Sequence, residues 1–99
     1  MPSKVHLDDA EGEPHATLFP ESEPKTIRLR LAAGESVPEH DHPGRVIVLH
    51  LLAGEVELSL DGEVHEAVAG DVLRFDGDQQ IAPTAVEDSE ALLVLAPAA

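Results

Sequence analysis

The sequence has no cysteine, which excludes disulfides and thiolate metal sites. It has no tryptophan or tyrosine and only two phenylalanines, so an aliphatic core is expected. The longest apolar stretch, residues 46–53, is interrupted by His50 and is too short to cross a bilayer. The chain does not begin with basic residues followed by an apolar run, so no signal peptide is expected. We therefore expect a cytoplasmic protein without membrane attachment.

Basic residues are few and acidic residues are many. Six scattered lysines and arginines stand against 20 aspartates and glutamates, which gives a formal net charge of −14. Nucleic acids and anionic membranes need a cationic surface, so neither is an expected partner. Two explanations of the acidity remain: a surface that attracts cations or a basic partner, and adaptation of the whole cell to high salt. Because the acids are spread from Asp8 to Glu90, we favour the halophilic explanation.

The pattern of the chain changes at residue 25. Residues 1–24 are polar and broken by prolines, and are expected to form an N-terminal arm that lies on the domain or on a partner subunit. Residues 25–99 alternate short apolar segments with turn signals, which predicts one all-β domain, a sandwich or small barrel without a helix of consequence. The expected strands cover 26–31, 46–52, 55–60, 63–68, 72–75, 80–86 and 91–95, with a short extended piece at 36–40. Asp61-Gly62 predicts a type I′ hairpin turn.

A spaced motif in the β segment carries a resemblance to a known family. The glycines and histidines of the first cupin motif have counterparts at the required spacings: Gly34, His40, His42 and Gly54. The later stretches "VHEAVAGDVLRF" and "AVEDSEALLVL" are similar to the second half of the cupin pattern. Residues 25–96 thus resemble a small single-domain cupin of the RmlC-like family. The resemblance implies a double-stranded β-helix, which is a small jelly-roll β-barrel.

The resemblance also implies where a metal would bind. Metal-bearing cupins use two histidines and a glutamate of the first motif and a histidine of the second. Here His40 and His42 are present, but Ile47 stands at the glutamate position, and Ile81, or Gln80 if the loop is shorter, stands at the last histidine position. Residues two apart in an extended strand point to the same side, so both imidazoles can face one ion.

Two imidazoles supply about half of the binding free energy of a zinc site with four protein ligands. This corresponds to a dissociation constant of about micromolar to millimolar. We therefore expect at most a weak site for a divalent metal such as zinc, nickel, iron or manganese. Gln80 is a weak candidate for a third ligand.

Three functions are compatible with these residues. The first is non-catalytic binding of a small, largely apolar molecule that presents an acceptor or a carboxylate to the histidines. Its pocket would be lined by Ile47, Leu49, Phe75 and Ile81, unless the barrel is filled by its own side chains. The second is a metal-dependent enzyme of the dioxygenase or isomerase type that uses His40 and His42. The third, a regulatory module acting through a protein partner, rests on fold analogy alone. No base with an orienting acid can be identified, so we favour binding and assign no catalytic residue.

The other histidines are interpreted as structural or solvated. His50 has the opposite parity to the inward residues of its strand and should point away from the barrel interior, between sheets or into a subunit interface. His65 shares a face with Ala67, where packing is expected. His6 and His15 lie in the polar arm and are expected to be solvated.

A second apolar face is expected on the strand that contains His50. Val46, Val48 and Leu52 alternate with the inward residues and therefore point away from the interior. Such a face needs a cover, either the second sheet or a partner. We expect a two-fold homodimer, which small cupins commonly form.

Overall fold

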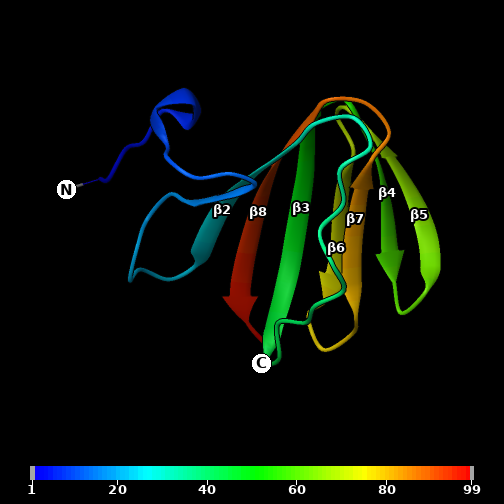
Figure 1. Cartoon of the computed structure of the whole chain (residues 1–99). Helices are drawn as coiled ribbons and strands as arrows, with labels where there is room; N and C mark the ends of the chain where they lie inside the picture. Colours follow the sequence, from blue (N-terminus) through cyan, green and yellow to red (C-terminus); the bar gives the residue numbers. More distant parts are fainter. Residues whose placement is uncertain (1, 99) are drawn as a thin grey trace.

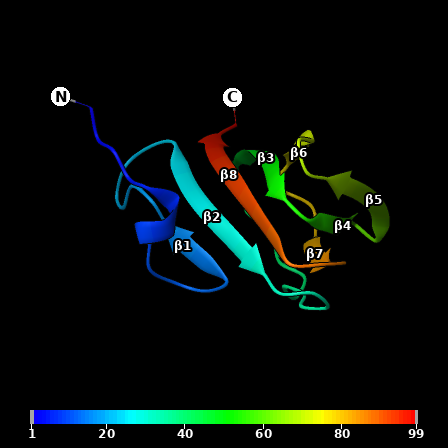
Figure 2. The same cartoon turned by 90° about the horizontal axis from the view of Figure 1, so that it is seen from above.

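The computed structural model describes residues 2–98 and is built from two packed sheets. The strands are β1 (His15–Thr17), β2 (Lys25–Leu31), β3 (Arg45–Ala53), β4 (Glu55–Leu60), β5 (Glu63–Val68), β6 (Val72–Asp76), β7 (Ile81–Ala85) and β8 (Ser89–Pro97). One sheet has the order β1-β2-β8-β3-β6 and the other β5-β4-β7, with antiparallel pairing throughout. Figures 1 and 2 show the two layers facing each other. This is the jelly-roll barrel that the sequence predicted.

Alternating apolar residues form the core between the sheets. The inward side chains of β2, β3, β4 and β8 are buried: Ile27, Leu29, Leu31, Ile47, Leu49, Leu51, Val56, Leu58, Ala91 and Leu95. The core is aliphatic except for Phe75, which is 8% exposed. Strand periodicity of two explains why these residues share one side.

Turns fix the order of the strands. Asp61 and Gly62 both have positive φ, 50° and 85°, which is the type I′ geometry expected for the β4–β5 hairpin. Gly54, between β3 and β4, has a φ of 86°, and a Cβ there would overlap the carbonyl of Asp88 and the side chain of Ser89. Only glycine meets both demands at this position.

The connection between β2 and β3, residues 32–44, lies against β7. Its backbone pairs with β7 at two bridges, Ser36 with Thr84 and His40 with Ile81. His40 and Ile81 exchange both backbone hydrogen bonds, at 3.1 and 2.7 Å. The connection thus extends the smaller sheet as an irregular edge, and Figure 1 shows it running down the molecule beside β6 and β7. This pairing decides where the histidines of the motif lie.

The N-terminal arm is more ordered than its composition indicated. It contains a short 3-10 turn, η1 (Leu7–Asp9), and the strand β1, which pairs with β2 and forms the edge of the larger sheet. The boundary at residue 25 therefore separates two parts of one sheet. Within residues 2–98, no helix has the length and apolar character needed to span a membrane.

Candidate functional site

A pocket lies between the two sheets and has a volume of about 400 Å³. Its walls come from β1, β2, β3, β4, β6, β7 and β8, and from the connection that follows β2. The apolar lining consists of Ile27, Leu29, Val37, Pro38, Ile47, Leu49, Leu58, Phe75, Ile81, Pro83, Leu93 and Leu95. The structure places all four residues of the sequence-based pocket hypothesis, Ile47, Leu49, Phe75 and Ile81, in this lining.

His40 and His42 both line the pocket. Their ring centroids are 5.0 Å apart and the ring planes are nearly perpendicular, at 85°. His40 Nδ1 lies 3.0 Å from the carbonyl oxygen of Pro38. The carbonyl can only accept, so Nδ1 carries the proton, and in the neutral ring Nε2 then offers a lone pair.

The turn between β6 and β7 holds the His42 segment in place. The backbone N–H of His42 donates to the carbonyl of Gly77 at 2.7 Å, and the N–H of Gly77 donates to the backbone carbonyl of Arg45 at 2.8 Å. A Cβ at Gly77 would overlap the carbonyl oxygen of His42. The N–H of Gly44 donates to the Asp78 carboxylate at 3.0 Å. Glycine at position 77 therefore permits the close approach that brings His42 to the pocket.

The donor set fits a full cupin metal site poorly. Within residues 2–98, no group of three or more histidine, aspartate, glutamate or cysteine side chains is arranged to hold a metal ion. Ile47 and Ile81 occupy the positions of the missing ligands and are buried, at 1% and 4% exposure. Gln80 is exposed, its backbone N–H bonds to the carboxylate of Asp61, and it is not part of the pocket lining. The structure therefore gives no support to Gln80 as a third ligand.

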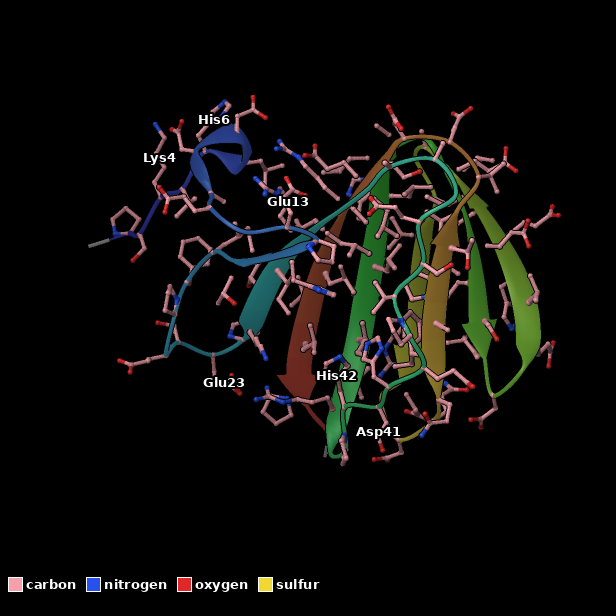
Figure 3. All side chains as sticks on the ribbon, viewed as in Figure 1. Lys4, His6, Glu13, Glu23, Asp41 and His42 are labelled. Atoms are coloured by element: carbon pink, nitrogen blue, oxygen red, sulfur yellow. The ribbon has the colours of Figure 1, made fainter. Side chains whose placement is uncertain are left out.

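A third histidine, His15 of β1, also lines the pocket. The expectation that His15 is solvated agrees with its exposed side chain, but the residue also borders the pocket, which was not expected. Composition could not reveal this, because a three-residue strand in a polar arm has no periodic signal. His6, the other arm histidine, accepts a hydrogen bond from the Asp8 N–H and stands at the outer end of the arm in Figure 3.

Burial and neighbouring positive charge disfavour imidazolium in the pocket. Burial is the main cause that lowers the pKa of His42, followed by the charges of His40, Lys25 and His15. Asp41 acts in the opposite direction, but it is exposed beside His42 (Figure 3). Burial is also the main cause that lowers the pKa of His15, followed by His40 and Lys25. Both rings are therefore biased towards the neutral form at pH 7.

The remaining histidines lie outside the pocket lining. His50 is opposite Leu92 and Val72 on the outer face of the larger sheet, the direction that its sequence parity predicted. His65 of β5 is opposite Leu58, with Nε2 3.8 Å from the Glu63 carboxylate.

Comparison with known proteins identifies the family. Residues 27–96 match the cupin domain family Cupin_2. The chain belongs to this family. No curated protein matches this cupin. It is similar over its whole length to a solved RmlC-like cupin from Desulfovibrio desulfuricans, with 28% identity, a TM-score of 0.79 and 99% of that chain covered.

Two further solved structures share the cupin fold at lower identity. One is the Cupin_2 domain of an XRE family transcriptional regulator from Enterobacter cloacae, with 23% identity, a TM-score of 0.74, and coverage of 83% of this chain and 93% of that chain. The other is KdgF from Halomonas sp., with 17% identity, a TM-score of 0.77, and coverage of 96% and 92%. These two likenesses establish the fold alone.

Proposed function

We propose that this cupin binds a small, largely apolar and uncharged molecule in the pocket between its sheets, without catalysing a reaction. The observation that carries the proposal is the pocket, with its volume of about 400 Å³, its aliphatic walls and its few polar groups. Small-molecule sites commonly have volumes of about 300–1,000 Å³ with such a lining. An apolar cavity of about 150 Å³ is already large enough for benzene.

The hydrogen bond of His40 decides which polar group of a ligand is recognised. Because Nδ1 donates to Pro38, Nε2 of the neutral ring is an acceptor, and it has no hydrogen-bond partner within residues 2–98. A hydroxyl or N–H group on the ligand would satisfy it, whereas an ether oxygen would not. The expectation of an acceptor or carboxylate on the ligand is therefore replaced by a hydrogen-bond donor.

Charge also disfavours an anionic ligand. Glu39 lines the pocket, and the chain has a formal net charge of −14. The pKa values of His15 and His42 are lowered, mainly by burial, so these rings provide little compensating positive charge at pH 7. A carboxylate would lose hydration without gaining a counter-ion. The ligand class is a neutral apolar molecule with a donor group.

A divalent metal at His40 and His42 would be held by two imidazoles and water. Such a site is weak and unselective. Which of zinc, nickel, iron and manganese occupies it would depend on metal availability and on the general order of affinities of divalent metals. A metal-dependent enzyme is the alternative function, and it is supported only by the closeness of the two rings. Calorimetric titration of tag-free protein with zinc and nickel distinguishes non-catalytic ligand binding from a metal-dependent enzyme. Micromolar or tighter binding, abolished in a His40→Ala/His42→Ala variant, would favour the alternative.

A matched set of bicyclic probes tests the binding proposal. We expect 2-naphthol to bind more tightly than 2-methoxynaphthalene by about 2- to 10-fold, the worth of one hydrogen bond, and 2-naphthoate to bind most weakly. His40→Phe should remove the preference for 2-naphthol and keep binding of the ether. His50→Phe, on the outer face, is the control and should change neither. If none of the probes binds at millimolar concentration, the binding function is refuted; if 2-naphthoate binds best, the donor rule is refuted.

We also infer that a second copy of the chain covers the outer face of the larger sheet. There Val48 stands between Val94 and Arg74, and Val72 is 61% exposed. Arg74 makes no ion pair within residues 2–98, whereas Arg30 and Arg45 pair with carboxylates. In a two-fold arrangement, Arg74 of each copy would face the acidic surface of the other, which provides charge complementarity beside an apolar centre.

A further inference from the structure

Arg28 of β2 fastens the N-terminal arm to the outer face of the larger sheet. Its side chain is completely buried, with 0% exposure. Nη1 donates to the carbonyls of Leu7 at 2.6 Å and Ala10 at 3.1 Å, and Nη2 donates to Gly12 at 2.9 Å. The Glu13 carboxylate is 3.6 Å from Nη2. A buried guanidinium is costly unless such partners satisfy it, so this residue and the arm stabilise each other.

The arm then continues into β1, which crosses to the pocket side. In the pairing of β1 with β2, Ala16 is opposite Arg28 and His15 is opposite Leu29. Neighbouring residues of a strand point to opposite faces. Ala16, 1% exposed, therefore lies on the face of Arg28, while His15 lies on the face of Leu29, which lines the pocket. Figure 2 shows η1, β1 and β2 lying together at this edge.

We propose that His15 determines specificity as a second polar contact for the ligand, and that Arg28 is the positioning residue that holds it there through the arm. The proposal rests on the binding function proposed above. Arg28 does not touch the pocket. It fixes the segment that precedes β1, and so fixes where the His15 ring stands.

The two polar contacts come from opposite sheets. His15 belongs to the edge of the larger sheet, whereas His40 lies on the connection that pairs with β7 of the smaller sheet. Both rings line the same pocket. A ligand between the sheets can thus meet one imidazole from each side. This arrangement specifies an apolar molecule with two hydrogen-bonding groups, such as a diol or a dihydroxyarene.

The experiment compares 2-naphthol with 2,6-dihydroxynaphthalene, each titrated under anaerobic conditions. In the unmodified protein, the second hydroxyl should strengthen binding by about 2- to 10-fold. His15→Phe should abolish that gain, so that the two probes bind with equal affinity. Arg28→Met should also abolish it. Arg74→Met is the matched control, because Arg74 is another outer-face arginine of the same sheet, and it should retain the full gain.

A ligand-free measurement checks the role of Arg28 separately. The N–H of Arg30 donates to the carbonyl of Pro14 at 2.8 Å, which joins the start of β1 to β2. Hydrogen exchange of this amide should become faster in Arg28→Met and stay unchanged in Arg74→Met.

The outcomes are distinguishable. If 2-naphthol itself does not bind, the proposed function fails. If 2-naphthol binds but the second hydroxyl adds nothing, or His15→Phe keeps the gain, the role of His15 is refuted while the binding function stands. If Arg28→Met keeps both the gain and the slow exchange, Arg28 is not the positioning residue. Should Arg28→Met fail to fold, Arg28→Lys and the His15→Phe result still decide the proposal.

Discussion

Replacing a leucine by alanine tests whether the pocket is open in solution. Leu49 and Leu51 lie on the same strand, face the same side and are 2% and 0% exposed, but only Leu49 lines the pocket. A buried Leu→Ala substitution costs about 2.7–5 kcal/mol, more where neighbouring atoms surround the deleted methyl groups completely. We therefore expect Leu51→Ala to lower the free energy of unfolding by about 4–5 kcal/mol. The Leu49 side chain already faces empty volume, so Leu49→Ala should lower it by only about 2.5–3.5 kcal/mol.

Urea denaturation followed by circular dichroism measures both losses. The expected difference of about 1.5 kcal/mol corresponds to about 6–12 °C in the melting temperature of a domain of this size. The slope with urea should stay the same, so that the shift of the midpoint reports stability alone. A loss for Leu49→Ala equal to or greater than that for Leu51→Ala would show that Leu49 is packed on all sides. The pocket would then be filled in solution, and the reasoning would be refuted.

Four further predictions follow from individual features. Gly54→Ala should destabilise the fold by more than Gly62→Ala, because both have positive φ but only Gly54 lies against another backbone, and equal midpoints in urea would contradict this. Since burial lowers the pKa of His42, the unfolded chain binds its proton first, and stability should fall as the pH drops below about 6.5. His42→Gln in chelator-containing buffer should reduce that fall, as urea midpoints from pH 7.5 to 6 will show. If acidity reflects a saline habitat, molar NaCl should raise the melting temperature through screening, and a temperature independent of salt would speak against this. Val48→Asp should convert the proposed dimer to a monomer in light scattering after size exclusion, whereas Val64→Asp on the smaller sheet should not; a wild-type monomer would end that proposal.

Strands with alternating residues were predictable almost to the residue. The expected segment 55–60 is β4 and 63–68 is β5, and the Asp-Gly signal gives the predicted turn between them. The reason is physical: burial of one face imposes a period of two, and a two-residue turn fixes the register. For the same reason, the inward residues Ile47 and Leu49 could be assigned to the interior from sequence alone.

Contacts made through the backbone were not predictable. Arg28 alternates with apolar residues and so lies on the side of β2 away from the core, yet it is buried because three carbonyls of the arm accept hydrogen bonds from its guanidinium. Carbonyls are common to all residues, so no sequence signal marks them. The place of His15 beside the pocket depends on the backbone pairing of β1 with β2, and it was not predicted either. The sequence likewise left open whether Gln80 or Ile81 stands at the position of the second-motif histidine. The backbone pairing of His40 with Ile81 places Ile81 beside the pocket.

The acidity of the chain and the character of the pocket are separable properties. Surface carboxylates interact through solvent, where molar salt reduces the screening length to about 3 Å. The proposed ligand contacts are instead hydrogen bonds to an uncharged molecule, and burial lowers the pKa of His15, one of the two contacting histidines. Such contacts have almost no salt dependence, whereas an anion drawn by imidazolium would be released as salt increases. Binding of 2-naphthol should therefore keep its affinity between low and molar salt while the stability of the fold rises. A strong loss of affinity with salt would instead show that the histidines act as charged groups, and the ligand class would have to be anionic.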